Sequence, residues 1–272
     1  MAIITISRQL ASYGDEIGSK VAEILGYKFF GKKDIEKRII ALGFPESKLS
    51  KFDDRKIGFL AGLTRSRDEY LNYLMTAILE TASENNCVIV GRGSFIILKD
   101  LANHVSCRFI ADENARCERI QDELNINQKA ASKKIAESEA RQKGFHKEFF
   151  NFNINDPAMF DLIASTSKVN PESIARSVVA LTNEYVTPEC EEAGQRKIDE
   201  MLIGQRIVDI LTFIYNLEIN FLRASIDGKI ITLHGIASTQ KDVDAAVTIV
   251  EAELPNYQVK SSISVARDYK AY

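Results

Sequence analysis

The stretch that decides the fold is the opening one, "IITISRQLASYGDEIGSKVAEILG" (residues 3–26). The β-branched run at Ala2–Ile6 predicts a short buried strand. Four apolar residues then recur at helical spacing: Ile17, Val21, Ile24 and Leu25. This order predicts a strand, a loop and a helix. A loop in that place presents unpaired backbone N–H groups beside a helix N-terminus, and both attract phosphate.

The loop itself is poor in glycine and carries acids. The strict phosphate-binding pattern GxxxxGK[ST] has a lysine and a hydroxyl after its last glycine, whereas Gly14 is here followed by Asp15 and Glu16. At roughly 6 Å and an effective dielectric near ~20, Asp15 would repel a phosphate by about 3 kcal/mol unless Mg²⁺ lay between them. Acids in a first helical turn also favour the helix dipole without any ligand. The sequence is therefore equally consistent with a phosphate-binding loop and with a capped helix start that binds no ligand.

Further strands and helices alternate along the first two thirds of the chain. Strands are predicted at 87–90, 105–111 and 160–166, and long helices at 67–84 and 113–142. Strands separated by helices imply crossover connections. The fold class predicted is an α/β domain with a parallel sheet flanked by helices, over residues 1–183.

The composition changes near residue 185. Residues 184–199 are polar, contain a proline and a glycine, and predict a linker. Beyond them the pattern restarts as helix, strand, strand, helix, strand, with Asp227-Gly228 as the hairpin turn. Residues 200–268 are therefore expected to form a small αββαβ domain.

Bulk composition excludes several classes. The 272 residues are 45% hydrophobic and carry a net charge of −3, which does not favour nucleic acid as a partner. No apolar stretch is long enough to span a membrane, and no signal peptide is recognisable, so we expect a cytoplasmic protein. The four cysteines and three histidines lack metal-site spacing, so no metal site is expected in the protein itself and the thiols are expected to be reduced.

Three segments together resemble the cytidylate-kinase-like family of P-loop proteins. They are "ITISRQ…SYGDEIGSKVAEILGYKFF", "VIVGRGSFIIL" and "DPAMFDLIASTSK". That family commonly reads S-R-x-x-G-S-G-G-R-E-I-G at the loop, and the resemblance covers residues 1 to about 180. It implies a nucleoside monophosphate kinase fold, ATP with Mg²⁺ at the loop, and a pyrimidine nucleotide opposite.

The chain departs from the family pattern inside the loop. Two family glycines are replaced by Ala11 and Tyr13, and the arginine after the last glycine is replaced by Asp15. Gly31 stands where the family usually has an aspartate. The family's lid segment often reads D-R-x-R, of which only Arg141 clearly remains.

The resemblance assigns site residues position by position. The ATP phosphates are assigned to the loop residues Ser7, Arg8, Ala11, Ser12, Tyr13, Gly14, Asp15 and Glu16. Among these, Ser12 and Glu16 are expected to assist Mg²⁺. Arg92 and Lys32 are assigned to the substrate phosphate, with plain surface charge as the alternative for Lys32. Arg119 and Arg141 are assigned to the transferred group, although Arg119 at helical spacing from Arg116 also fits a solvated helix face.

Residues 200–268 resemble a BON domain, on "ASIDGKIITLHGIAS" and "DVDAAVTIVEAELPNYQVKSSISV". The resemblance implies a module that binds a ligand or a membrane surface, and a homodimer contact is the alternative. Two functions follow for the whole chain. One is ATP-dependent phosphorylation of a nucleoside monophosphate, weakened by the altered loop. The other is a catalytically silent nucleotide-binding regulatory protein whose C-terminal module binds a ligand or partner.

Overall fold

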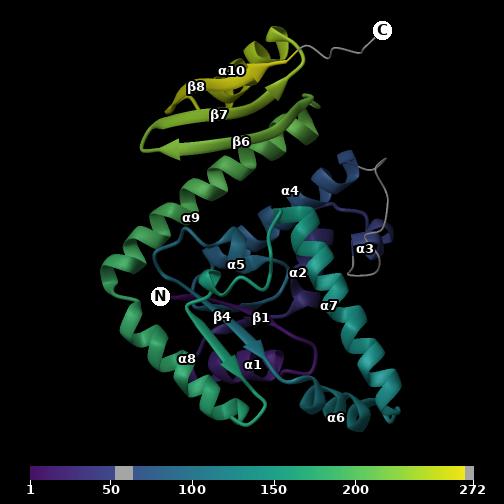
Figure 1. Ribbon diagram of the computed structural model, residues 1–272. Helices are drawn as coiled ribbons and strands as arrows, with labels where there is room; N and C mark the ends of the chain where they lie inside the picture. Colours follow the sequence, from purple (N-terminus) through teal and green to yellow (C-terminus); the bar gives the residue numbers. More distant parts are fainter. Residues whose placement is uncertain (53–63, 267–272) are drawn as a thin grey trace. The chain divides into compact units, whose positions relative to one another are not determined.

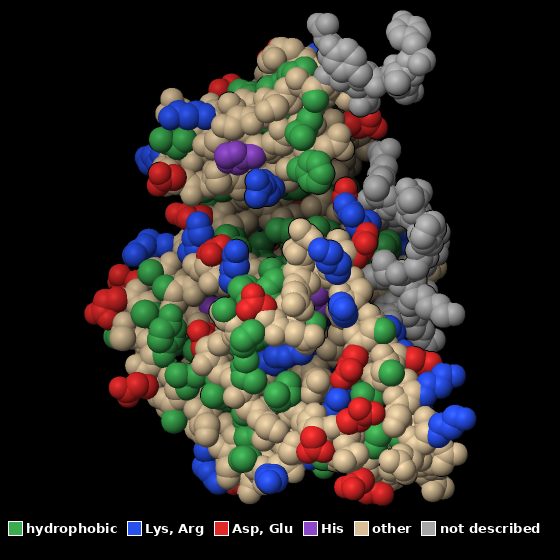
Figure 2. All heavy atoms as spheres, viewed as in Figure 1, with side chains coloured by type: hydrophobic (Ala, Val, Ile, Leu, Met, Phe, Trp, Pro, Cys, Tyr) green, Lys and Arg blue, Asp and Glu red, His purple; other side chains and the backbone are tan. Residues whose placement is uncertain are grey.

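The computed structural model describes residues 1–52 and 64–266 (Figure 1). The chain divides into two compact units, Met1–Gln195 and Arg196–Tyr272. Among the described residues no helix is both long and apolar enough to cross a membrane. On the face of the first unit seen in Figure 2, acidic and basic side chains are interspersed rather than separated.

A five-stranded parallel sheet forms the centre of the first unit. Its strands are β1 (Ile3–Arg8), β2 (Lys28–Phe30), β3 (Cys87–Val90), β4 (His104–Ile110) and β5 (Leu162–Ser165), in the order β2-β3-β1-β4-β5. All four pairings are parallel. This confirms the predicted α/β class. β2 was not predicted, because three residues are too few to show a period.

Helices cover this sheet (Figure 1). They are α1 (Gly14–Leu25), α2 (Lys32–Ala41), α3 (Glu46–Phe52), α4 (Thr64–Ser83), α5 (Ser94–Ile97), α6 (Glu113–Leu124), α7 (Gln128–Phe150) and α8 (Pro171–Tyr185), with a 3-10 turn at Pro157–Met159. α1 and α8 supply Ile17, Val21, Ile174 and Val178 to one buried cluster with the strands. β1 is buried from Ile3 to Ser7, as expected for a central parallel strand.

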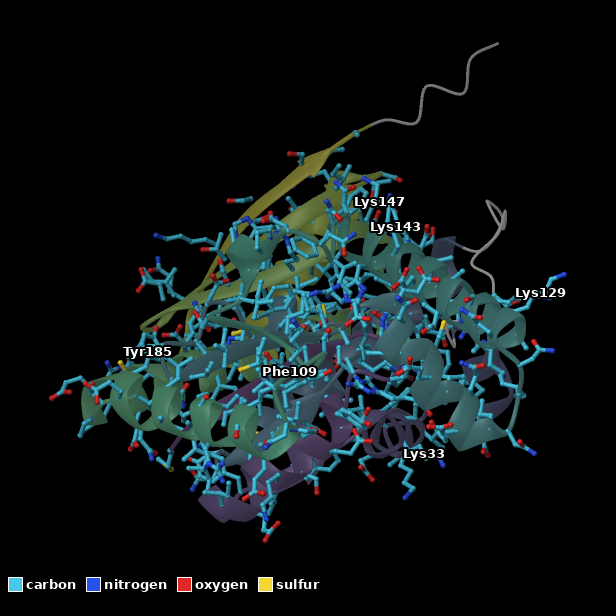
Figure 3. All side chains as sticks on the ribbon, turned by 60° about the horizontal axis from the view of Figure 1, so that its bottom comes forward. Lys33, Phe109, Lys129, Lys143, Lys147 and Tyr185 are labelled. Atoms are coloured by element: carbon cyan, nitrogen blue, oxygen red, sulfur yellow. The ribbon has the colours of Figure 1, made fainter. Side chains whose placement is uncertain are left out.

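The helix expected at 113–142 is in fact two helices, and that prediction was wrong. α6 ends at Leu124, and its C-cap Asn125 has a left-handed φ of 50°; α7 begins after Asn127, whose side chain accepts from the Ala130 amide at 2.9 Å. Asparagine tolerates the left-handed region and is a strong N-cap. α7 then runs to Phe150 with Lys129, Lys143 and Lys147 pointing outward (Figure 3).

Three of the four cysteines are buried and all four are free, which fits the expectation of reduced thiols. Burial raises the pKa of the Cys87 thiol to about 12. A thiol in that environment remains protonated and behaves as a small apolar side chain.

The second unit has the predicted order. The segment expected as a linker, 184–199, is helical along most of its length, because α9 (Pro188–Asp209) begins there with a proline and acids in its first turn. A π-helical turn (Ile210–Ile214), β6 (Ile219–Asp227), β7 (Ile230–Ala237), α10 (Gln240–Glu253) and β8 (Gln258–Val265) follow. β6 and β7 are antiparallel, β7 and β8 parallel, and Ile226, Leu233 and Val250 lie in their shared core.

Candidate functional site

In the loop between β1 and α1, two residues other than glycine adopt the left-handed backbone conformation that glycine usually adopts. Ala11 and Tyr13 have φ values of 59° and 57°, in the left-handed region. These are the two positions at which the resembling family has glycine. Glycine enters this region freely, whereas other residues are strained there. The turn is therefore maintained by surrounding contacts.

Several backbone N–H groups at this turn have no protein acceptor. Within residues 1–52 and 64–266, the amides of Tyr13, Gly14, Asp15 and Glu16 donate to nothing, and the first satisfied amide of α1 is Ile17, which donates to the Tyr13 carbonyl at 2.9 Å. Unpaired donors at a helix start carry partial positive charge. The loop thus offers donors for an anion.

Ser12 ties the loop to β4. Its side chain is 1% exposed, and its hydroxyl lies 2.9 Å from the Gln9 carbonyl and 3.1 Å from that of Phe109. The Gln9 amide donates to the same Phe109 carbonyl at 3.0 Å. Because the hydroxyl is buried among carbonyls, the expected contact between Ser12 and Mg²⁺ does not fit this structure.

Arg119 braces the loop from α6. Its guanidinium donates to the Ala11 carbonyl at 2.8 Å, to the Thr166 hydroxyl at 3.0 Å and to the Thr166 carbonyl at 2.6 Å. It also lies 4.1 Å from the centre of the Tyr13 ring. These contacts hold both left-handed residues in place. Arg119 is therefore beside the loop, and its role toward a transferred group stays a prediction.

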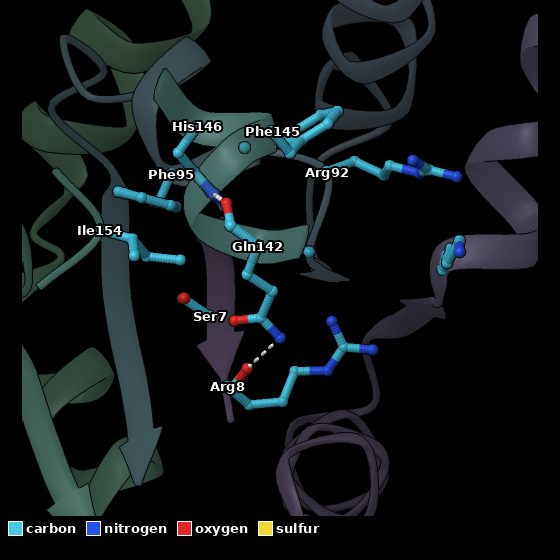
Figure 4. Close-up of a pocket in the computed structure, with 11 residues that line it drawn as sticks. Ser7, Arg8, Arg92, Phe95, Gln142, Phe145, His146 and Ile154 are labelled. Atoms are coloured by element: carbon cyan, nitrogen blue, oxygen red, sulfur yellow. Dashed lines mark hydrogen bonds between the residues drawn. The ribbon is translucent and has the colours of Figure 1, made fainter. Parts of the chain in front are cut away.

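A small pocket of about 50 Å³ lies where β1 and β3 end, below α7 (Figure 4). Ligands of parallel sheets bind at this end of the strands. Three cations contribute to the pocket: Arg8, Lys32 and Arg92. Its other lining residues are Ser7, Gly91, Gly93, Phe95, Gln142, Phe145, His146 and Ile154. The structure thus brings Ser7, Arg8, Lys32 and Arg92 together, but leaves Arg119 and Arg141 outside the lining.

Arg92 is held by internal contacts. It pairs with Glu36, donates to the Phe52 carbonyl at 3.4 Å, and lies 5.9 Å from the Phe145 ring centre. Its φ of 55° is left-handed, between Gly91 at 83° and Gly93 at 69°. Backbone strain of this kind is found where the chain must approach a ligand closely.

Arg8 lies at the boundary between loop and pocket. Its Nε and Nη2 donate to the two Asp15 carboxylate oxygens at 3.0 and 3.2 Å. In Figure 4 its side chain extends below the pocket, and the Gln142 amide reaches its backbone carbonyl at 3.1 Å. This hydrogen bond connects α7 to the end of β1.

Arg141, the residue assigned to the family's lid segment, lies outside the pocket, and its role toward a transferred group stays a prediction. Arg141 is a third exposed and lies 3.9 Å from Glu137 on its own helix, whereas its neighbour Gln142 lines the pocket. Phe145 and His146 also line it, one turn further on. In the sequence His146 lies among Phe145, Phe149, Phe150 and Phe152, a run that fits base stacking as well as a helix core.

Arg108 of β4 was missed altogether. It is 6% exposed, donates to the Ser7 hydroxyl at 3.0 Å and to the Asn155 side-chain oxygen at 3.3 Å, and makes no ion pair among the described residues, although the charge of Glu139 acts on it. Burial lowers the pKa of its guanidinium. A buried cation without an anionic partner favours an anion in the neighbouring pocket.

The fold and this site define a class: an α/β protein with a strand–loop–helix anion site beside a cationic pocket. A family model described as "Cytidylate kinase-like family" matches residues 3–168. The chain belongs to the cytidylate kinase-like family.

Curated relatives are similar to this chain in sequence, and a solved structure is similar to it in fold. A cytidylate kinase of Methanocaldococcus jannaschii is 34% identical over 98 residues, 35% of this chain and 55% of that protein. A cytidylate kinase of Methanococcus maripaludis is 28% identical over 131 residues, 47% of this chain and 74% of that protein. The chain thus spans little more than half of the first relative's length. An uncharacterized protein from Eubacterium ventriosum superposes with a TM-score of 0.55 at 19% identity, covering 67% of this chain and 98% of that one. It shows the fold alone.

Proposed function

We propose that the protein transfers a phosphoryl group from ATP to a nucleoside monophosphate, of the pyrimidine class. The observation that carries this proposal is the gathering of Arg8, Lys32 and Arg92 around one pocket at the carboxyl ends of β1 and β3. Phosphoryl transfer is catalysed by positioning and by neutralising charge. The ATP phosphates on the loop amides and the acceptor phosphate in the pocket would lie on either side of Arg8.

The residues fit ATP better than they fit a dedicated metal site. The amides of residues 13–16 would hold the ATP phosphates, and Arg92, Lys32 and Arg108 would attract the acceptor phosphate. Mg²⁺, held by phosphate oxygens with Glu16 as the available carboxylate, would neutralise the charge that develops during transfer. Among the described residues no group of three or more His, Cys, Asp or Glu side chains is arranged for a metal.

Arg92→Lys tests the acceptor side. Lysine keeps the charge that balances Glu36 but loses the planar fork that recognises phosphate. We expect ADP release with CMP, dCMP or UMP to fall by about tenfold or more in kcat/KM. Arg176→Lys is the matched control, because Arg176 is exposed on α8 and its partners among the described residues, Glu172 and Ser173, belong to its own helix. Unchanged turnover in Arg92→Lys would remove Arg92 from the site.

The catalytically silent alternative is favoured by one observation: Arg92 and Arg119 are already engaged by protein groups. In that case the C-terminal αββαβ unit, which resembles a BON domain, would carry the activity by binding a ligand or a second copy of the chain. ATP would then raise the melting temperature without any ADP release. Turnover with any of the three acceptors would contradict this alternative.

A further inference from the structure

Arg8 stands between two glycine turns. Its aliphatic stem fills the space over Gly14, where an added Cβ would lie 2.4 Å from the Arg8 Cβ. Its Nη1 lies 2.8 Å from the position of a Cβ on Gly91. Gly14 begins α1 at the anion loop, and Gly91 lines the pocket. The absence of side chains at both turns lets one guanidinium reach both places.

Between the end of β1 and the first turn of α1, residues 9–16 include no lysine or arginine. The strict pattern places a lysine after the last loop glycine, and the resembling family has an arginine there, but this chain has Asp15. Arg119 is nearby, yet its donors are used by the Ala11 and Thr166 carbonyls. Within residues 1–52 and 64–266, the guanidinium of Arg8 makes its hydrogen bonds to a single side chain, Asp15.

The resemblance already assigns Arg8 to the ATP phosphates; we propose that Asp15 is the counter-ion that occupies the Arg8 guanidinium until a phosphate displaces it, an arrangement called here the Arg8–Asp15 lock. This inference rests on the proposed function, because it concerns phosphate binding at the same loop. The Arg8 and Asp15 side chains are 24% and 53% exposed, so their pair is weak and exchangeable. A polyphosphate carries more charge and offers guanidinium a bidentate contact, so it displaces Asp15. A weakly charged anion does not.

Two effects of Asp15 must be distinguished: its pairing with Arg8, which an anion has to break, and its direct repulsion of the anion. A double-mutant cycle separates the two effects. Tripolyphosphate binding without Mg²⁺ is measured by calorimetry for the wild type, Asp15→Asn, Arg8→Gln and the double variant. We expect Asp15→Asn to tighten binding by about three- to tenfold and Arg8→Gln to weaken it by about tenfold or more. In the Arg8→Gln background, Asp15→Asn should tighten binding by a smaller factor than in the wild type, because only the direct repulsion between Asp15 and the anion is relieved and no Arg8–Asp15 pair remains to be broken.

Glu16→Gln is the charge-matched control. Glu16 is the next residue of the same helical turn, and it is exposed like Asp15 but is not bonded to Arg8. The lock predicts a smaller gain for Glu16→Gln than for Asp15→Asn. Equal gains from both substitutions, retained in the Arg8→Gln background, would overturn the lock and leave the proposed function standing. A wild-type protein that binds neither tripolyphosphate nor ATP would instead overturn the proposed function.

Discussion

Ala11 and Tyr13 show how a loop can lose its glycines and keep its shape. Each non-glycine residue in the left-handed region costs about 1–2 kcal/mol. The strain at both residues is offset by one side chain, Arg119, which bonds the Ala11 carbonyl and stacks on the Tyr13 ring. Ala11 and Tyr13, which stand where the family has glycine, therefore alter the side chains around the loop more than they alter its backbone.

Restoring glycine at residue 11 tests this view of the loop. Ala11→Gly relieves the left-handed strain but loosens the unfolded chain, so we expect stability within about 1 kcal/mol of the wild type. Ala22→Gly, inside α1 and 4% exposed, should lose about 1 kcal/mol or more. Urea unfolding measures both. A loss from Ala11→Gly as large as that from Ala22→Gly would show that the backbone at Ala11 is not strained.

Residues predicted for the site lie together in the structure where the chain fixes a strand end. Ser7 and Arg8 close β1, and Arg92 follows β3, so the sheet itself brings them together. Arg141 does not line the pocket whereas Gln142 does, because adjacent residues of a helix point about 100° apart and spacing alone does not say which of them faces the pocket. Arg108 gave no signal, since one charged residue inside an apolar strand does not reveal its neighbours.

At the scale of elements, boundaries were the weakest part of the prediction. The apolar spacing of 113–142 continues through Asn125 and Asn127, but local turn and capping chemistry ends one helix and begins another. The polar segment at 184–199 is the reverse case. Its composition predicts a linker, yet a proline start and acidic first turn place it mostly within α9.

The pairing of β1 and β4 contains a buried histidine that makes stability depend on pH. His104 of β4 lies 2.7 Å from the Thr5 hydroxyl of β1. Burial lowers the pKa of His104 to about 4, against a smaller opposing effect of Asp161. Its folded-state pKa lies below the ordinary value of about 6.5, so its contribution is complete above pH ~6.5 and is lost as the pH falls toward ~4.

His104→Gln isolates that contribution. Glutamine can still hydrogen-bond Thr5 but does not titrate in this range. The wild type should lose about 3 kcal/mol more than His104→Gln between pH ~6.5 and ~4, by urea unfolding at each pH. Parallel curves for the two proteins would contradict a buried, neutral His104.

At the scale of the whole molecule, the fold class could be predicted because the order of strands and helices along the chain restricts how the strands can pair. Strands that alternate with helices leave little choice but a parallel sheet, and the Asp227-Gly228 turn predicts the hairpin of the second unit. The functional roles of the two units could not be predicted from the order of their strands and helices. They depend on which side chains converge in space and on what each unit binds.

The central claim is that the main-chain amides between β1 and α1 receive phosphate. Its most direct test is a titration of ¹⁵N-labelled full-length protein with ATP, followed by the amide resonances of residues 10–17 and the Arg8 Nε–H signal. We predict large, saturable shifts at Tyr13, Gly14, Asp15 and Glu16 together with a change at Arg8. Shifts confined to other parts of the chain, or none at saturating ATP, would contradict the account.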